Sequence, residues 1–159
     1  MTQEEYMKLA IQEAKKAAKK DEVPIGCIIV CNDQVIAKGH NQRESKQLTK
    51  NHAEMIAIER ANKKIGYWRL EECELYVTLE PCMMCMGAIY QSRIKKVYFG
   101  AYDAKGGICN SLIDFSQIKG LNHYPFIEGG ILKDECSNLL KEYFREKRKM
   151  QKSKTLPKE

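Results

Sequence analysis

The chain has 159 residues, a formal net charge of +6 and 43% hydrophobic residues, so it can bury one core of its own. Its N-terminus shows no charged leader followed by an apolar run, and no segment approaches the length of a membrane-spanning helix. These features argue against a secreted or membrane protein. We therefore expect a single cytoplasmic domain with no membrane partner.

The cysteine content fits a reducing compartment. Seven cysteines stand at positions 27, 31, 73, 82, 85, 109 and 136. Because this count is odd and no secretory signal is evident, reduced thiols explain it better than a disulfide framework. We expect two of them to bind metal and the others to serve as small hydrophobic residues.

The hydrophobic pattern alternates between helical spacing and short apolar runs. In chain order it predicts a helix from Thr2, strands at 25–31 and 35–39, a helix from His52 to about Lys64, a strand at 74–79, a helix from Pro81 to about Arg93, strands at 96–100 and 124–127, and a last helix from about Asp134. Thr2 and Glu5 have the spacing of a capping box. Strands that alternate with helices favour an α/β fold, with an antiparallel hairpin beside parallel strands and helices on both faces.

The last helix ends in a strongly basic segment. Its residues at core spacing are Cys136, Leu139, Leu140, Tyr143 and Phe144. Residues 145–159 hold seven Lys or Arg and two Glu, a net charge of +5. Such a segment suits a polyanionic partner such as nucleic acid, and equally suits a solvated terminus. We expect a domain at 1–144 and a basic, frayed extension of the last helix at 145–159.

Two short motifs, His52-Ala53-Glu54 and Pro81-Cys82-Met83-Met84-Cys85, can form one metal site. A neutral imidazole and two thiolates are usual zinc ligands, and three protein ligands leave the fourth position open for water, as catalytic zinc requires. On a helix the two cysteines share a face, and the helix N-terminus favours thiolates. We predict that His52, Cys82 and Cys85 bind one Zn²⁺ per chain.

Glu54 is the predicted catalytic residue. In mid-helix, His52 and Glu54 would diverge by roughly 200°, so the pair makes sense only at a helix start, where the histidine can reach a metal beyond the terminus. Zinc would lower the pKa of its bound water, and Glu54 would carry the proton to the ring nitrogen and the departing amine. The pattern H-x-E followed by P-C-x-x-C is the signature of zinc-dependent nucleobase deaminases.

Each motif alone has a simpler interpretation. A C-x-x-C pair more often marks a structural zinc site or a redox pair, and a lone histidine at a helix end usually binds no metal. A closed structural site would need a fourth ligand, for which Cys73 or Cys109 could serve. Neither belongs to a second C-x-x-C pair, and the combination of both motifs favours catalysis.

The chain resembles the bacterial tRNA wobble-position adenosine deaminases, members of the cytidine/deoxycytidylate deaminase superfamily, over nearly its whole length. The matching segments are Glu22-Val23-Pro24-Ile25-Gly26, Asn41, His52-Ala53-Glu54, Tyr67-Trp68-Arg69-Leu70, residues 75–82, Ser92-Arg93-Ile94, Asp103-Ala104-Lys105-Gly106, Asn122-His123 and Glu142-Tyr143-Phe144-Arg145. The resemblance implies a three-layer α/β/α cytidine-deaminase-like fold with a five-stranded mixed sheet. It also implies a homodimer with active sites near the subunit interface, and hydrolysis of adenosine to inosine in the tRNA anticodon loop.

The same resemblance implies substrate-binding roles for further residues. Asn41 would hydrogen-bond the extruded purine, and Ile25 would help form the base pocket. The positions that match the RNA-binding surface of the family are Asp103, Lys105, Asn122, His123, Phe144 and Arg145. Two of them have equally good alternatives, because Asp103 could be a turn residue and Phe144 has core spacing.

One stretch departs from the family pattern. Members commonly carry Pro-Thr-Ala just before the histidine, whereas this chain carries Thr49-Lys50-Asn51. A proline and a small residue are thus replaced by bulkier polar ones. The substitution puts the local backbone path and the stringency for substrate in question, although no catalytic residue is lost.

The sequence therefore favours a tRNA adenosine deaminase over two alternatives. A deaminase of free bases or nucleosides, such as guanine or cytidine, would share the metal chemistry, but the basic tail and the RNA-surface matches argue against it. A non-catalytic RNA-binding module with structural zinc would have four protein ligands. Glu54 argues against that module, because a purely structural site has no use for an unliganded carboxylate.

Overall fold

The computed structural model describes residues 1–155, with side chains described through Ser153. In chain order its elements are α1 (Gln3–Lys19), β1 (Gly26–Cys31), β2 (Gln34–His40), α2 (Arg43–Lys46), α3 (Ala53–Ile65), β3 (Cys73–Leu79), α4 (Met83–Gln91), β4 (Lys96–Ala101), the 3₁₀ helix η1 (Phe115–Gln117), β5 (Phe126–Glu128) and α5 (Lys133–Thr155). The predicted helices and strands are confirmed, with bounds shifted by a few residues. The short helices α2 and η1 were not predicted.

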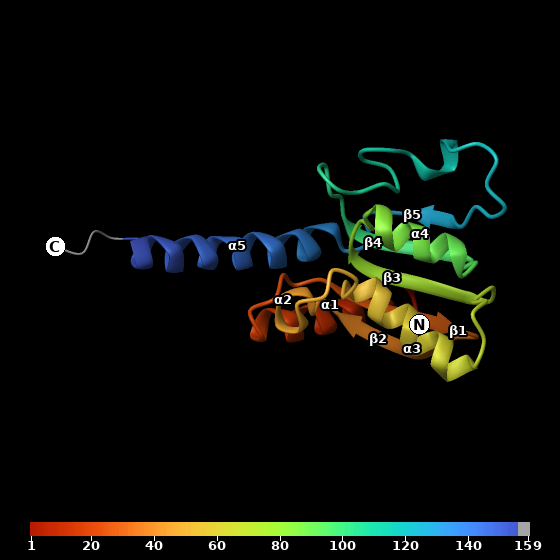
Figure 1. Cartoon of the computed structure of the whole chain (residues 1–159), viewed down its shortest axis with the longest axis horizontal. Coiled ribbons are helices and arrows are strands. Elements are labelled where there is room, and N and C mark those ends of the chain that lie inside the picture. The colour runs from red at the N-terminus through yellow and green to blue at the C-terminus, as the bar shows by residue number, and fades with distance from the viewer. Residues whose placement is uncertain (156–159) are drawn as a thin grey trace.

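The strands form one mixed sheet in the order β2-β1-β3-β4-β5 (Figure 1). β1 pairs antiparallel with both β2 and β3, whereas β4 pairs parallel with β3 and with β5. The β1–β2 hairpin turns at Asn32 and Asp33, which both have a positive φ, of 52° and 61°. The predicted α/β fold with an antiparallel hairpin beside parallel strands is therefore confirmed.

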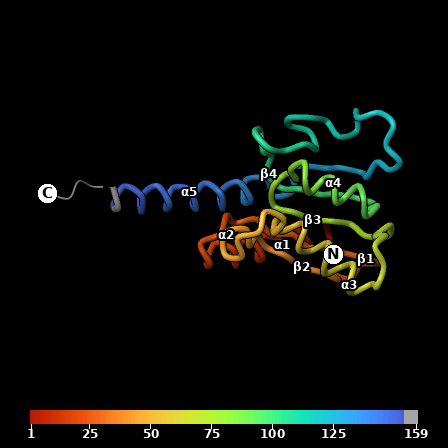
Figure 2. The backbone as a smooth tube through the Cα atoms, in the orientation of Figure 1, coloured from red at the N-terminus to blue at the C-terminus, as the bar shows by residue number. Residues whose placement is uncertain are grey.

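Helices cover both faces of the sheet, as the tube view also shows (Figure 2). Side chains alternate along β1, so Cys27 and Ile29 join the core beneath α3 and α4, while Ile28 and Val30 pack toward α1. On that second face, α1 begins where Thr2 caps the helix by accepting a hydrogen bond from the Glu5 N–H. Each face of the sheet thus has its own core.

The helix that carries His52 lies very close to the sheet. A Cβ on Gly39 of β2 would stand 2.5 Å from the Ala53 carbonyl oxygen at the start of α3, so only glycine allows this approach. The small residues Ala53, Ala57 and Ala61 form the buried face of α3. This packing fixes the start of α3 at one end of the sheet, where the site described below is found.

α5 runs from the sheet into a projecting arm (Figure 1). Cys136 is buried at its start, but Phe144 is 45% exposed, and its ring lies at 77° to the Tyr143 ring with the centroids 5.3 Å apart. Of the two alternatives for Phe144, the one in which it packs in the core is therefore wrong, because the helix has left the sheet by this residue. The structure describes helix through Thr155, and residues 156–159 of the predicted basic extension lie outside the described residues. Within the described part, no helix is long and apolar enough to cross a membrane.

Candidate metal centre and active site

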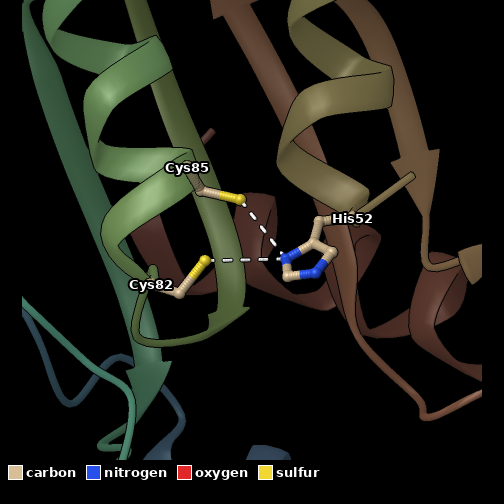
Figure 3. A group of neighbouring side chains, drawn as sticks. All are labelled: His52, Cys82 and Cys85. Carbon is tan, nitrogen blue, oxygen red and sulfur yellow. Dashed lines mark hydrogen bonds between the residues drawn. The ribbon is translucent and has the colours of Figure 1, made fainter. Parts of the chain in front are cut away.

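The candidate metal ligands lie at the starts of two helices. His52 is the N-cap of α3, with extended backbone angles, and Cys82 is the N-cap of α4. Cys85 lies in the first turn of α4 and is fully buried. Because both helices begin at the same end of the sheet, the three side chains converge, as Figure 3 shows. The predicted position of His52 at a helix start is confirmed, whereas Cys82 precedes its helix instead of lying within it.

The spacing of the three donor atoms fits a tetrahedral zinc ion. His52 Nδ1 lies 3.6 Å from each cysteine Sγ, and the three ligand atoms all lie within 4.8 Å of one another. A zinc ion about 2.3 Å from sulfur and about 2.0–2.1 Å from nitrogen holds tetrahedral sulfur and nitrogen ligands about 3.6 Å apart. The three residues could therefore hold a metal without rearrangement.

The electrostatics of the cluster favour one thiolate and a protonated imidazole in the absence of metal. The hydrogen bond from Cys85, with help from His52, lowers the pKa of Cys82 to about 3. The pKa of the Cys85 thiol is raised, because this thiol donates to Cys82 and is buried. Hydrogen bonding to Cys82 raises the pKa of His52. A divalent cation would displace these protons, since zinc binds thiolate and neutral imidazole.

Glu54 lies beside the cluster on the buried side of α3. Its side chain is 4% exposed and interacts with the Cys85 thiol. Burial raises the pKa of Glu54 to about 7. The carboxyl group therefore has the proton affinity of a group that exchanges protons near neutral pH.

A small hollow of about 100 Å³ opens next to His52 and Ala53. Its other lining residues are Val23, Ile25, Asn41 and Arg43. The structure thus brings Ile25 and Asn41, which lie on two different loops, together with the metal cluster. The Asn41 side chain donates to the Val23 carbonyl at 3.4 Å and accepts from the Arg43 N–H at 3.1 Å.

The predicted RNA-contact residues lie on three other segments, of which two are loops and the third is α5. The Asp103 carboxylate accepts the backbone N–H groups of Lys105 and Gly106, so Asp103 is a turn residue here, while the Lys105 side chain is exposed. On the second segment Asn122 is exposed, and the His123 ring contacts the Ile94 carbonyl at 2.6 Å.

Phe144 and Arg145 on α5 are both exposed. Phe144 lines a separate hollow that it shares with Val23, a residue that also lines the hollow beside His52. Val23 is the lining residue that the two hollows share.

The cysteines considered as a fourth ligand lie outside the cluster. In the part of the chain that the structure describes, the group around His52 contains only Cys82 and Cys85 as further ligands. Cys73 instead faces Cys31 across the β1–β3 pair, at the other end of β3. Cys109 is buried in the core beneath α4. A closed four-ligand site is therefore not formed by the described residues.

Sequence reasoning missed two buried carboxylates that organise the loops around the site. Glu22 accepts the backbone N–H groups of Glu44 and Ser45, and Glu80 accepts those of several residues between 103 and 111. Both side chains are at most 2% exposed. For Glu80 the available signal was its position between the apolar run 75–79 and Pro81, which names no partner, whereas Glu22 follows the polar residues Lys19-Lys20-Asp21 and carries no such signal.

Hydrogen bonds hold the backbone and side chain of Asn51, the last residue of the stretch Thr49-Lys50-Asn51 that departs from the family pattern. The Asn51 carbonyl accepts the Gln42 N–H at 3.0 Å, and the Asn51 side chain is buried and accepts from the Lys50 amine at 3.4 Å. Lys50 and Asn51 line a hollow of about 360 Å³ beside α3. Lys50 and Asn51 therefore give this hollow a polar lining, and hydrogen bonds hold the loop at Asn51.

Comparisons with known proteins agree with this site. A model of the MafB19-like deaminase family matches residues 1–148. A tRNA-specific adenosine deaminase of Bacillus subtilis (strain 168) is 51% identical over 154 residues, covering 96% of each chain. A second tRNA-specific adenosine deaminase, from Streptococcus pyogenes serotype M18, is 43% identical over 148 residues and covers 93% of each chain.

A solved structure from a study of A-to-I editing by tRNA:A34 deaminases at the wobble position of transfer RNA superposes with a TM-score of 0.82 and 39% identity. The match covers 86% of this chain and 99% of that one. It includes the mixed sheet and the helices on both faces, so the cytidine-deaminase-like α/β fold is confirmed. The chain belongs to the tRNA-specific adenosine deaminase family.

Proposed function

We propose that this protein is a zinc-dependent hydrolase that converts adenosine to inosine at the wobble position of a tRNA anticodon. The observation that carries the proposal is the position of buried Glu54 beside a three-ligand cluster, next to a hollow that could take a base. Three protein ligands are the number found in catalytic zinc sites. The choice of substrate is supported by the relative from Bacillus subtilis, which bears the name of a tRNA-specific adenosine deaminase.

The proposed chemistry divides between the ligands and Glu54. His52, Cys82 and Cys85 would hold one Zn²⁺, which when bound supplies the Lewis acidity that makes water nucleophilic at neutral pH. Glu54 accepts the proton of the attacking water on its carboxylate. It delivers this proton to the purine ring nitrogen, and then carries the second proton of the same water, from the hydroxyl now on the purine carbon, to the amine, so that the C–N bond breaks, ammonia leaves and inosine remains.

The hollow beside His52 is proposed as the base pocket. Ile25 and Val23 provide apolar walls, and Asn41 provides a polar group at the rim. The Asn41 amide donates to Val23 through a long bond of 3.4 Å, which a purine acceptor could replace. A base can enter this hollow only when it is extruded from the anticodon loop.

Exposed polar and basic residues around the pocket are proposed to hold the RNA. The exposed members of this set are Lys105, Asn122, Arg145 and the aromatic Phe144, and the partly exposed members are Asp103 and His123. Lys105 and Arg145 are suited to phosphate contacts, and the exposed Phe144 ring is suited to stacking on a base or ribose. The Asp103 side chain would act by shaping the turn that carries Lys105.

A homodimer in the cytoplasm completes the proposal. The homodimer is what the resemblance to the family implies, and a subunit packed over the start of α4 would cover Met83, which follows the ligand Cys82 and is 67% exposed. The seven cysteines are unpaired in the structure, as suits a reducing compartment. Light scattering on the purified protein would measure the mass of the assembly.

Deamination of free guanine is the second candidate function. A solved guanine deaminase from Bacillus subtilis superposes on this chain with a TM-score of 0.62 and 30% identity, covering 76% of this chain and 87% of that one. The metal chemistry is the same for both substrates. The projecting basic part of α5 favours RNA, since a free base gains nothing from it.

A substrate panel tests the two candidates against each other. Purified protein with one equivalent of zinc is incubated with anticodon stem-loops that carry adenosine at the wobble position, and separately with free guanine, cytidine and adenosine. We expect inosine only from the stem-loops, and loss of turnover after chelation that added zinc restores. If free guanine is turned over rapidly and the RNA is not turned over at all, deamination of free guanine becomes the preferred function.

A further inference from the structure

A buried carboxylate links the loop before the metal ligand Cys82 to the loop that carries Asp103 and Lys105. Glu80 follows β3 and is 2% exposed. Its carboxylate accepts the backbone N–H groups of Asp103 at 3.0 Å, Cys109 at 3.1 Å, Asn110 at 2.8 Å and Ser111 at 2.9 Å. It also accepts the Ser111 hydroxyl. One side chain thus satisfies donors from both ends of the segment 103–111.

The segment is wrapped tightly around this carboxylate. A Cβ on Gly107 would lie 2.2 Å from the carboxyl carbon of Glu80, so no other residue fits there without displacing the carboxylate. The Ile108 N–H donates to the Pro81 carbonyl at 3.1 Å. Ile108 and Cys109 are buried in the core beneath α4. The segment is therefore fastened to Glu80 and Pro81, directly before the ligand Cys82.

The exposed part of the segment depends on the same fastening. The backbone of Asp103 is held by Glu80, and the Asp103 side chain in turn accepts the N–H groups of Lys105 and Gly106. The turn is closed by the Gly107 N–H, which donates to the Asp103 carbonyl at 2.8 Å. A short series of hydrogen bonds thus runs from Glu80, two residues before Cys82, to the exposed Lys105.

We propose that Glu80 is a positioning residue for the RNA substrate: its carboxylate sets the conformation of the segment 103–111 and so places Lys105 relative to the metal site. This inference rests on the proposed function. Glu80 touches neither metal ligand atoms nor substrate and acts only through the segment that it holds. Its loss should therefore weaken substrate binding more than the chemical step.

Glu80→Gln is the appropriate change because it keeps the shape of the side chain. A glutamine has one acceptor oxygen, and its NH₂ group would face backbone N–H groups that need an acceptor. The amide therefore cannot replace a carboxylate that receives five hydrogen bonds. Ser111→Ala is a milder change, since it removes only the hydroxyl contact and leaves the four backbone donors.

The experiment measures kcat and KM on an anticodon stem-loop together with amide hydrogen exchange in the zinc-loaded enzyme. In Glu80→Gln we expect KM to rise about tenfold or more, kcat to stay within about threefold, and the amides of Cys109, Asn110 and Ser111 to exchange at least about tenfold faster. In Ser111→Ala we expect the same changes in smaller size. Zinc content should remain one per chain in both variants.

Glu13→Gln is the matched control. Glu13 is also a buried carboxylate, but its partners are Lys16 and His40 and it contacts no part of the segment 103–111. This variant should be less stable than the wild type, and its KM should be unchanged. If lost stability alone raised KM, Glu13→Gln would show the increase as well.

Three results would overturn the inference. They are an unchanged KM in an active Glu80→Gln enzyme, an equal KM increase in Glu13→Gln, and unchanged exchange of the segment amides. Failure of the wild-type enzyme to deaminate any stem-loop would count against the proposed function instead, and it is seen before any variant is made. If Glu80→Gln does not fold, the direction of KM in Ser111→Ala decides the question.

Discussion

The Glu22 carboxylate accepts a hydrogen bond of 3.0 Å from the backbone N–H of Glu44, which lies 22 residues later in the chain. A second bond from the Ser45 N–H completes the attachment of α2 to the loop before β1. Glu22 has no exposed surface and directly precedes Val23, a lining residue of the hollow beside His52. One buried charge therefore holds two of the loops that shape the proposed base pocket.

This arrangement predicts a pH-dependent stability. Burial alone would raise the pKa of Glu22, but the hydrogen bonds from Ser45 and Glu44 outweigh it, and the pKa is lowered. A lowered folded-state pKa stabilises the fold fully above the unfolded value of about 4.3, and this stabilisation is lost as the pH falls through the folded value. Glu22→Gln should lower the free energy of unfolding at pH 7 by about 1–3 kcal/mol and flatten its decline toward pH 3.

Urea denaturation between pH 3 and pH 7 measures both effects. Glu44→Gln is the control, because this side chain is exposed and its ion pair with Arg43 is on the surface. The control should match the wild type within about 0.5 kcal/mol. If the free energy of unfolding of Glu22→Gln declined toward pH 3 as steeply as that of the wild type, the lowered pKa would not belong to Glu22.

Glu54→Gln should lower kcat on the stem-loop by about 10²–10⁴-fold, since a general acid–base group contributes on this scale. The amide keeps the shape of the side chain but cannot accept the proton of water. Zinc content, measured by emission spectrometry, should stay at one per chain because Glu54 is not among the three clustered ligands. Turnover equal to that of the wild type would rule out the proposed proton transfer.

The set of three metal ligands predicts that two buried cysteines, Cys85 and Cys109, differ in their effect on zinc binding. Cys85→Ser should reduce zinc content to well below one per chain, because serine oxygen is a poor zinc ligand and one of three protein ligands is lost. Cys109→Ser is the matched control, as Cys109 is also buried but lies outside the cluster. Zinc titration after dialysis against a chelator distinguishes the two, and similar zinc loss in both variants would argue for a different ligand set.

The convergence of the metal ligands could be predicted because it depends on local signals. Both motifs stand at the start of a helical pattern, which placed His52 correctly at the start of α3, whereas Cys82 was placed within its helix and is instead the N-cap of α4. The attachments made by Glu80 could not be predicted, since its partners lie 23 to 31 residues away and are backbone groups of no particular sequence. The sequence left the exposure of Phe144 open because helical spacing does not indicate where a helix leaves its sheet.

The polar stretch before His52 should affect substrate choice more than catalysis. Asn51→Ala keeps the backbone carbonyl that accepts the Gln42 N–H, so the path of the loop is retained. We expect zinc content to be unchanged and kcat on the preferred stem-loop to stay within about threefold. Relative rates on a panel of anticodon stem-loops measure selectivity, and a large loss of zinc would show that Asn51 supports His52 directly.

The exposed basic residues of α5 give the last prediction. Arg145 and Arg148 lie three residues apart on one side of the helix, and neither forms an ion pair with any residue in the described part of the chain. Unpaired arginines that contact RNA phosphates release counterions on binding. The double variant Arg145→Gln/Arg148→Gln should therefore bind the stem-loop more weakly and reduce the slope of log K against log salt by about one to two.

Lys149 and Glu146 provide the control on the same helix. Their side chains pair at 3.5 Å, so Glu146→Gln/Lys149→Gln removes one ion pair and leaves the net charge unchanged. If α5 contacts RNA phosphates through Arg145 and Arg148, this control should bind like the wild type with an unchanged salt slope. If the basic segment is only a solvated extension, both double variants should bind the stem-loop like the wild type. Only phosphate contacts by Arg145 and Arg148 would make Arg145→Gln/Arg148→Gln bind more weakly than the control.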